Sequence, residues 1–371
     1  MTGTRLSGTG SPLAAGSTRP PTEVYDVALL DLDGVVYVGP DAVPGVPAAL
    51  AAARAAGMRL GFVTNNAARP AEDVARHLTE LGVPTQSDDV ITSSQAAATV
   101  VADLLGPGGH VLAVGGPGVT AALRAAGLTV VDRAEDSPAA VVQGYGPEVG
   151  WRQLAEAVVA VRNGARHVAT NTDATIPSPR GPLPGNGAMV AVVSNVTGQR
   201  PLVTGKPDPA MHAECVRRTG ARRPLVVGDR LDTDIEGARR AGAASLLVLT
   251  GVTDPGTLLA AGPLHRPDLL SADAAGLLTP HPPVVADGTG LRCGGWSVRS
   301  AEGEDVLLLH GAADAGHDDS QDDGLDGLRA LCVAHWARHP EEEAQVRVVA
   351  ADVRAAEALE RWGLAEEAPA Q

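Results

Sequence analysis

Short apolar runs that end in polar residues alternate with helical stretches along most of the chain. The run Val24–Leu30 ends in the segment Asp31-Leu32-Asp33-Gly34. A continuous apolar run is typical of a buried parallel strand, and open α/β sheets bind ligands at the carboxyl ends of such strands. The Ala-rich stretch Val46–Ala56 predicts a helix that Gly57 can end, and Leu60–Val63 predicts the next strand. This order is that of a βαβ unit.

The pattern continues through a second α/β region and then returns to the first theme. Three further strands are expected, near residues 111–114, 139–142 and 167–170. A helix is expected over Trp151–Val161. Leu225–Val227 predicts a strand that again leads to a carboxylate, Asp229, and Ser245–Leu249 predicts another strand. This arrangement indicates a core domain that is interrupted by an inserted domain.

The predicted fold class is α/β, with a Rossmann-like parallel-sheet core, an inserted α/β cap domain and a small C-terminal α+β unit. The expected boundaries are a flexible tail over 1–22, a core over 23–88 and 199–278, the cap over 89–198, a linker over 279–290 and the C-terminal unit over 291–371. The tail is rich in Gly, Ser, Thr and Pro, and the linker is rich in Pro, as expected of irregular segments.

Composition narrows the classes of function. The formal net charge of −15 argues against a general nucleic-acid-binding protein, because affinity for the phosphate backbone comes from clustered Lys and Arg. The three cysteines are widely spaced, unlike a disulfide framework or a zinc site, so we expect a reducing cytoplasm. The sequence shows neither the apolar stretch of a signal peptide nor a membrane segment.

A single lysine, Lys206, stands among 29 basic residues. Lysine and arginine differ in shape, hydration and donor geometry, so a compact ammonium is hard to replace where a point charge enters a narrow site. Chance survival of one lysine is the competing explanation. Lys206 is therefore a candidate functional residue.

Polar clusters follow several predicted strands or loops. They are Asp31/Asp33, Thr64/Asn65, Lys206 and Asp229/Asp234. Each cluster alone has an ordinary explanation as a turn or a helix cap. Three of the four clusters follow a predicted strand, so parallel pairing would bring them to one edge of a sheet.

Four segments in this order resemble the haloacid dehalogenase-type phosphatases. They are Asp31-Leu32-Asp33-Gly34-Val35-Val36-Tyr37, Val63-Thr64-Asn65-Asn66, Gly205-Lys206-Pro207 and Gly228-Asp229-Arg230-Leu231-Asp232-Thr233-Asp234. The likeness covers about residues 24–275. Within it, the sequence is similar to the branch that includes phosphoglycolate, glycerol-phosphate and 4-nitrophenyl-phosphate phosphatases. That branch carries an α/β cap between the second and third motifs.

The chemistry of phosphoryl transfer explains the residue types. A phosphate monoester dianion repels an attacking carboxylate, so the site needs a divalent cation and a fixed positive charge. The resemblance implies Mg²⁺ as the cofactor, held by Asp31, Asp229 and the backbone carbonyl of Asp33. It also implies that Asp234 orients water on the metal.

The resemblance implies the catalytic roles as well. Asp31 is the expected nucleophile, and Asp33 would protonate the leaving alcohol and later activate water against the aspartyl-phosphate. Lys206 would neutralise both the phosphate and Asp31. The residues expected to bind phosphate oxygens are Thr64, Asn65 and Asn66.

The expected substrate is a small phosphomonoester, with glycerol 3-phosphate first and 2-phosphoglycolate second. A broad specificity for 4-nitrophenyl or pyridoxal phosphate is a further alternative. Aromatic residues make up only 2% of the chain, which argues against a stacked nucleobase. In the resembled branch the cap loop closes over the leaving group, so Asn171, Asp173 and Arg180 are candidate substrate contacts, with a solvated turn as the alternative. We also expect a homodimer through the cap.

Motifs of these kinds also occur in other classes of protein. A calcium-binding EF-hand loop would need polar ligands at Val35 and Ala42, so it is excluded. A phosphorylatable receiver module is the non-enzymatic alternative, although receivers are compact and Thr64 and Lys206 lie far apart in the sequence. The segment Gly116-Pro117-Gly118-Val119-Thr120-Ala121 fits a dinucleotide fingerprint, but its proline removes an amide, so an ordinary strand-to-helix turn is favoured.

The C-terminal unit faintly resembles acetyltransferases of the general-control family. The segments concerned are 321–326 and 358–364. Acidic residues crowd the first segment, and they would repel the pyrophosphate of coenzyme A: Asp318, Asp319, Asp322, Asp323 and Asp326. We therefore predict a non-catalytic unit, with a plain acidic linker and an active acetyltransferase as the alternatives.

Overall fold

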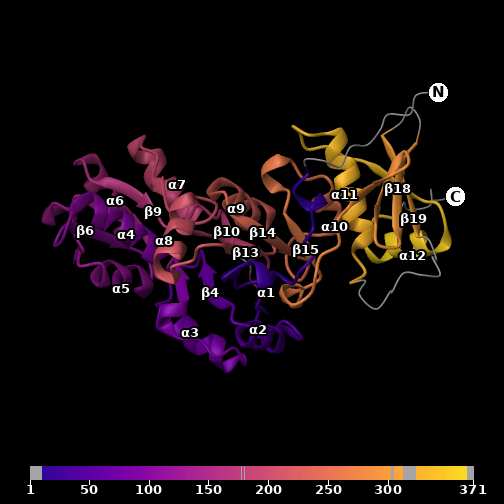
Figure 1. Ribbon diagram of the computed structural model, residues 1–371. Helices are drawn as coiled ribbons and strands as arrows, with labels where there is room; N and C mark the ends of the chain where they lie inside the picture. The colour runs from indigo at the N-terminus through magenta and orange to yellow at the C-terminus, as the bar shows by residue number, and fades with distance from the viewer. Residues whose placement is uncertain (1–10, 177, 179, 302–304, 312–322, 366–371) are drawn as a thin grey trace. The chain divides into compact units, whose positions relative to one another are not determined.

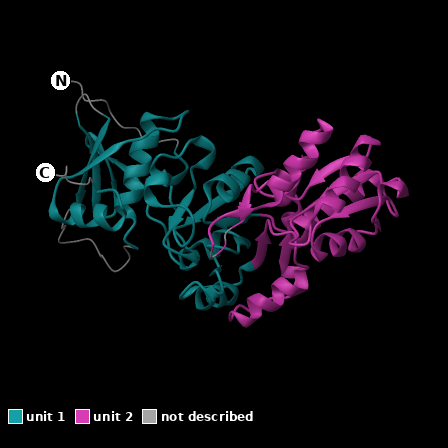
Figure 2. Ribbon diagram, turned by 180° about the vertical axis from the view of Figure 1, so that it is seen from behind, with its two compact units in different colours: residues 1–59, 223–371 teal, residues 60–222 magenta. Residues whose placement is uncertain are grey.

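The computed structural model describes residues 11–176, 178, 180–301, 305–311 and 323–365, which Figure 1 colours along the chain. The chain divides into two compact units, shown in different colours in Figure 2. The first unit comprises residues 1–59 and 223–371, and the second comprises residues 60–222. The second unit is therefore inserted into the sequence of the first.

A parallel sheet forms the centre of the first unit. Its strands are β1 (Val27–Asp31), β13 (Pro224–Gly228), β14 (Ala244–Val248) and β15 (Leu269–Ser271), which pair in the order β15-β14-β13-β1. The four residues Val27–Leu30 are each at most 2% exposed. Burial on both faces explains why this strand reads as a continuous apolar run rather than an alternating one.

Short helices and turns precede, connect and follow these strands. They are α1 (Pro21–Val24), α2 (Val46–Ala55), α9 (Glu236–Ala241), α10 (Pro255–Leu259), the 3₁₀ turns Pro12–Ala14, Pro263–His265 and Ala274–Leu277, the π-helical turn Leu231–Ile235, and the hairpin of β2 (Tyr37–Val38) and β3 (Asp41–Ala42). Helix α2 has a proline in its first turn and ends one residue before the predicted boundary.

The N-terminal segment differs from the predicted flexible tail. Leu13 is 2% exposed and belongs to the hydrophobic core of the first unit. The backbone N–H of Ser17 donates to the carbonyl of His281, and the N–H of His281 donates back to Ser17. Residues 11–22 therefore pack on the unit, because one buried leucine and a backbone bridge outweigh the local preference of Gly, Ser and Pro for irregular structure.

The second unit holds a five-stranded parallel sheet. Its strands are β6 (His110–Val114), β7 (Thr129–Val131), β8 (Ala140–Gln143), β9 (Arg166–Ala169) and β12 (Leu202–Val203), in the order β12-β9-β8-β6-β7. The unit also contains the parallel pair β4 (Arg59–Thr64) and β5 (Val90–Thr92), and the hairpin of β10 (Thr175–Ile176) and β11 (Leu183–Pro184).

Helices cover both faces of the five-stranded sheet. The helices of this unit are α3 (Ala71–Glu80), α4 (Ser93–Leu105), α5 (Pro117–Ala125), α6 (Trp151–Arg162), α7 (Asn186–Thr197) and α8 (Pro209–Thr219), with a 3₁₀ turn at Ser87–Asp89 and another at Ala134–Asp136. Val111 packs in one apolar cluster with residues of α4 and α5, whereas its neighbour Leu112 packs in another with residues of α6. Successive side chains of a strand point to opposite faces, so each strand contributes to two cores.

The C-terminal part of the first unit has its own sheet. The strands β16 (Val285–Asp287), β17 (Gly290–Cys293), β18 (Trp296–Ser300), β19 (Val306–Gly311) and β20 (Arg347–Ala350) pair in sequence order, antiparallel except for β19 with β20. Two helices, α11 (Asp326–Arg338) and α12 (Val353–Arg361), complete it. Every residue of α11 from Asp326 to Trp336 is buried.

The observed architecture confirms the predicted α/β fold class with a small C-terminal α+β unit. The predicted linker, residues 279–290, contains strand β16 and begins β17, so part of it belongs to the C-terminal sheet. The exact domain boundaries stay a prediction. Among the described residues, none of the helices is both long and apolar enough to cross a membrane.

Candidate active site

The first acidic residues lie where β1 ends. Asp31 is the last residue of the strand, and the chain then turns so that the N–H of Gly34 donates to the carbonyl of Tyr37 at 2.8 Å. Gly34 has a φ of 85°, and a Cβ at this position would overlap the carboxylate of Asp229. The glycine of the Asp-x-Asp-Gly segment is thus required twice, by its backbone conformation and by the close approach of Asp229.

Two more acids lie directly after β13. Asp229 is completely buried, and its Oδ2 accepts a hydrogen bond from the N–H of Val252 at 2.7 Å. Asp234 is 1% exposed within the π-helical turn, and its Oδ2 accepts from the N–H of Arg230 at 3.2 Å. Backbone amides therefore orient both carboxylates.

Asp31, Asp229 and Asp234 converge. Each offers a carboxylate oxygen, and these oxygens lie within 4.8 Å of one another. Like charges so close in a partly buried site disfavour one another unless a cation lies among them. Hard oxygen ligands with room for water are what Mg²⁺ prefers, so this cluster fits the predicted cofactor.

The cluster refines the predicted set of acids. The structure brings the carboxylate of Asp234 alongside those of Asp31 and Asp229, although the resemblance implied only an orienting role for it. The side chain of Asp33 is exposed and is not one of the three converging carboxylates. A side chain that is not engaged with a metal is what an acid and base catalyst requires.

The second unit joins the predicted phosphate-binding residues by hydrogen bonds. Asn65 follows β4, and its Oδ1 accepts from the backbone N–H of Lys206 at 2.8 Å. Its Nδ2 donates to the carbonyl of Lys206 at 3.1 Å and to Asp173 Oδ2 at 3.3 Å. The Lys206 Nζ lies 3.5 Å from the carbonyl of Val63. The side chain of Asn65 thus binds the backbone of Lys206, 141 positions later in the sequence. We call this pair of hydrogen bonds the clamp.

Close packing at Gly205 allows this clamp. A Cβ on Gly205 would overlap the carbonyl of Thr170, so only glycine lets the lysine loop approach the end of β9. Thr64 and Asn66 lie next to the clamp. The Oγ1 of Thr64 accepts from the N–H of Asn66 at 3.0 Å, and the Asn66 side chain is exposed.

The three predicted cap contacts have different surroundings. Asn171 is 4% exposed, and its Nδ2 donates to the carbonyl of Asn65 at 2.7 Å while its Oδ1 accepts from the N–H of Asp173. Its amide therefore positions the loops. Asp173 contacts Asn65, as described above. Arg180 is exposed between β10 and β11, apart from this hydrogen-bonded group.

Sequence reasoning missed one contact at the carboxylate cluster. Thr250 Oγ1 donates to the carbonyl of Gly34 at 2.5 Å, which ties the loop after β14 to the turn after β1. The available indication was that polar residues, Thr250 and Gly251, directly follow an apolar strand, as they do at the other strand ends.

The acids of the C-terminal unit have a different environment from the predicted one. Asp323 and Asp326 form ion pairs with Arg329 at 2.6 and 2.7 Å, and Arg329 also donates to the carbonyl of Leu270. Arg329 is 2% exposed. These two acids hold a buried guanidinium, so they do not belong to a plain acidic linker. Asp318, Asp319 and Asp322 lie outside the described residues.

Comparison with known proteins identifies the family. Residues 28–129 match the family described as haloacid dehalogenase-like hydrolase, and residues 203–277 match a second, HAD-hydrolase-like family. The chain is 43% identical over 352 residues to the D-glycerol 3-phosphate phosphatase of Mycobacterium tuberculosis, covering 92% of this chain and 94% of the relative. The chain belongs to the haloacid dehalogenase-like hydrolases. The predicted family and the predicted phosphatase class are confirmed.

Further similarities agree with this assignment. The crystal structure of a glycerol phosphate phosphatase from M. tuberculosis in complex with magnesium matches with a TM-score of 0.82 and 41% identity, covering 94% of this chain and 99% of that chain. The acid sugar phosphatase of Staphylococcus saprophyticus is 37% identical over 231 residues, covering 62% of this chain and 88% of the relative.

The C-terminal resemblance is also confirmed. Residues 293–364 match the family described as GCN5-related N-acetyltransferase like domain. This range contains the C-terminal strands β18 to β20 and both helices α11 and α12. The roles of the individual site residues in the hydrolase stay predictions.

Proposed function

We propose that this haloacid dehalogenase-like hydrolase is a Mg²⁺-dependent phosphatase that converts glycerol 3-phosphate into glycerol and phosphate. The observation that carries the proposal is the convergence of Asp31, Asp229 and Asp234 at the ends of two neighbouring parallel strands. The choice of substrate rests on the relative in M. tuberculosis, which is 43% identical to this chain over nearly the full length of both.

The proposed reaction has two steps. A carboxylate oxygen of Asp31 attacks phosphorus, and the bond between phosphorus and the glycerol oxygen breaks while Asp33 gives that oxygen its proton. Asp33 then takes a proton from water, and the resulting hydroxide attacks the aspartyl-phosphate at phosphorus. Phosphate leaves, and the carboxylate of Asp31 is restored.

The acidic residues have a second task, which is to hold Mg²⁺. Asp31 and Asp229, with the backbone carbonyl of Asp33, would bind it, and the position of Asp234 suits either direct binding or orientation of a water. When bound, the cation lowers the repulsion between the attacking carboxylate and the phosphate dianion.

The polar residues of the second unit would serve the phosphoryl group. In the family pattern, Thr64, Asn65 and Asn66 bind its oxygens and Lys206 neutralises its charge. The clamp between Asn65 and the Lys206 backbone supports this assignment, because it fixes the start of a long and otherwise flexible side chain. Asn171 and Asp173 would position the clamp rather than contact the substrate.

A panel of phosphomonoesters tests the proposal. Phosphate release is measured for glycerol 3-phosphate, 2-phosphoglycolate, 4-nitrophenyl phosphate and pyridoxal phosphate, with Mg²⁺ and with the metal chelated. We expect the highest kcat/KM for glycerol 3-phosphate and no turnover after chelation. Preference for another ester would refute the substrate, and turnover of none would refute the phosphatase reaction.

Three further expectations stay predictions. They are the cytoplasmic location, the homodimer through the cap and the lack of catalysis in the C-terminal unit. The three cysteines are all buried thiols, which agrees with a reducing environment but also with simple packing.

A further inference from the structure

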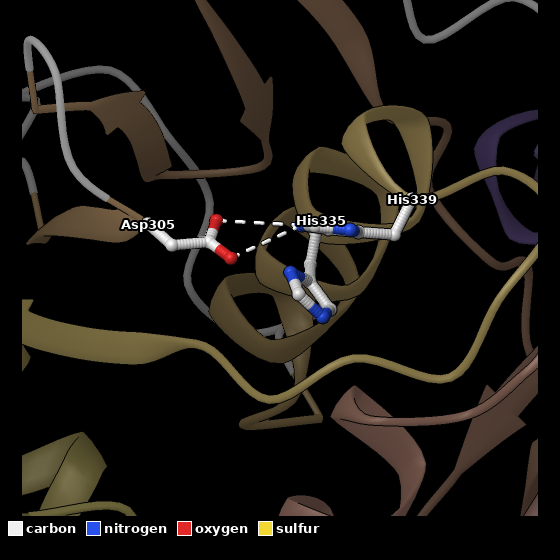
Figure 3. A group of neighbouring side chains, drawn as sticks. All are labelled: Asp305, His335 and His339. Carbon is white, nitrogen blue, oxygen red and sulfur yellow. Dashed lines mark hydrogen bonds and ion pairs between the residues drawn. The ribbon is translucent and has the colours of Figure 1, made fainter.

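A second group of metal-binding side chains lies in the C-terminal unit, away from the converging carboxylates in sequence. Figure 3 shows Asp305, His335 and His339, with dashed lines between the carboxylate of Asp305 and His339. Asp305 directly precedes β19, His335 belongs to α11 and His339 caps the C-terminal end of that helix. One ligand atom from each residue lies within 4.8 Å of the others. Residues four apart on a helix share one face, which explains why both imidazoles meet Asp305.

His335 has one nitrogen held and the other available. The side chain is 1% exposed, and its Nε2 lies 2.8 Å from the carbonyl oxygen of Ala344. A carbonyl can only accept, so Nε2 carries the proton and Nδ1 carries the lone pair. Nδ1 is buried and has no hydrogen-bond partner among the residues that the structure describes.

His339 has a carboxylate oxygen near each of its two ring nitrogens. Its Nδ1 lies 3.3 Å from Glu342 Oε1, and its Nε2 lies 3.2 Å from Asp305 Oδ2. Ligand atoms around a tetrahedral zinc ion, each about 2.1 Å from the metal, are about 3.4 Å apart. The separation between His339 and Asp305 matches that spacing. In both histidines the second nitrogen contacts an oxygen acceptor, which is how proteins orient imidazoles that bind metals.

Hydrogen bonds from Arg266 fix the backbone that follows helix α11. The guanidinium of Arg266 donates to the carbonyls of His339, Pro340 and Glu342 at 2.6, 3.0 and 3.1 Å. Arg266 is 6% exposed and lies over the ring of Trp336, 5.5 Å from its centroid. The loop that follows α11 is therefore fixed before any ligand arrives. Arg338 also contacts Asp305, 3.1 Å from Oδ1, while both carboxylate oxygens of Asp305 lie near His339 Nε2, Oδ2 at 3.2 Å and Oδ1 at 3.4 Å.

We propose that Asp305, His335 and His339 form a binding site for a divalent transition metal, with Zn²⁺ as the preferred ion. The protein ligands are His335 Nδ1, His339 Nε2 and a carboxylate oxygen of Asp305. Imidazole nitrogen favours Zn²⁺ over Mg²⁺, so this site differs in selectivity from the all-oxygen cluster of the hydrolase core. A bound ion joins the start of β19 to the end of α11 and stabilises the C-terminal unit.

Metal binding by the full-length protein tests the site. The chain is stripped with a chelator, and excess Mg²⁺ is added to saturate the carboxylates of Asp31, Asp229 and Asp234. Co²⁺ is then titrated as a spectroscopic probe, and Zn²⁺ affinity is measured against a chromophoric chelator. We expect one equivalent of bound Co²⁺ with the visible absorption of nitrogen ligation, its displacement by Zn²⁺, and a higher Tm with Zn²⁺.

Matched variants test whether Asp305 and His339 are responsible for the metal binding. His339→Gln and Asp305→Asn should each weaken Zn²⁺ binding at least about tenfold and remove the Zn²⁺-dependent rise in Tm. The control His310→Gln changes a partly exposed histidine of the same unit, paired with Asp352 at 3.6 Å, and should bind normally. Asp31→Asn should also keep the Co²⁺ spectrum, because its carboxylate belongs to the other cluster.

Two results would overturn the proposal. One is wild-type protein that binds neither Co²⁺ nor Zn²⁺ in excess Mg²⁺. The other is a folded His339→Gln variant that binds both ions as tightly as the wild type. In either case His339 serves as a hydrogen-bonded bridge between Asp305 and Glu342, and the substitution would change Tm equally with and without metal.

Discussion

Two groups of acidic residues in the first unit are stabilised in different ways. Asp323 and Asp326 pair with the guanidinium of Arg329, so the chain itself supplies the positive charge. Asp229 and Asp234 accept hydrogen bonds from backbone amides and converge with Asp31. The converging carboxylate oxygens of the second group are hard ligands, so this arrangement suits a divalent cation from solution.

The difference separates a structural cluster from the proposed catalytic one. A guanidinium that is fixed between two acids rigidifies the fold, because it satisfies them permanently. An exchangeable cation satisfies the acids and still leaves coordination positions for a substrate. Acidic motifs of similar appearance in the sequence therefore have different uses, and substitutions can separate them.

The largest expected effect is at Asp31. Asp31→Asn removes the proposed nucleophile while it keeps the shape of the side chain, so kcat for phosphate release should fall by at least about a thousandfold. Circular dichroism should show an unchanged fold. The control Asp232→Asn alters an exposed acid of the same motif as Asp229, and it should retain activity within about twofold because Asp232 pairs with Arg230 at the surface. An active Asp31→Asn enzyme would remove the proposed mechanism.

A smaller loss, in stability rather than activity, is expected at Arg329. Arg329→Leu leaves Asp323 and Asp326 without their cation, so the free energy of unfolding should fall by about 3–5 kcal/mol. Urea denaturation measures it. Arg292→Leu is the matched control, since its contact with Asp287 is exposed and 4.0 Å long, and it should cost at most about 0.5 kcal/mol. Equal stability of the two variants would contradict a structural role for the Arg329 pairs.

The smallest effect is expected at Asp234. Asp234→Asn keeps a side chain that can accept from the Arg230 amide but removes one negative charge from the converging cluster. The Mg²⁺ concentration for half-maximal activity should therefore rise by about tenfold to a hundredfold, with a smaller change in kcat. A Mg²⁺ titration of the initial rate measures this. An unchanged Mg²⁺ requirement would place Asp234 outside the metal site. Asp234 would then have a structural role, as Asp323 and Asp326 do.

Several features of the fold and site could be predicted from local sequence. The apolar runs gave strands β1, β13 and β14 to within a few residues, and the Ala-rich stretch gave α2, because burial and helix formation leave a local periodicity. Asp31 and Asp229 were found for the same reason, since each is the first carboxylate at a strand end. The family resemblance of the motifs then supplied the hydrolase, which the comparisons confirm.

Other features depend on contacts between distant residues. Residues 11–22 looked like a tail because the partners of Leu13 and Ser17 lie beyond residue 230. Asn171 was expected at the substrate, whereas its amide bonds to Asn65, 106 positions earlier. A local sequence pattern does not indicate which distant residues will be in contact.

The sequence by itself determined the kind of chemistry, because the strand-end acids and the solitary lysine are recognisable where they stand in the chain. Only the tertiary structure decided how each charge is satisfied. It joined Asp323 and Asp326 to Arg329, brought Asp234 to Asp31, and placed Asp305 beside two histidines about thirty residues later. The physical reason is that charge compensation acts over a few ångströms in space and is indifferent to separation along the chain.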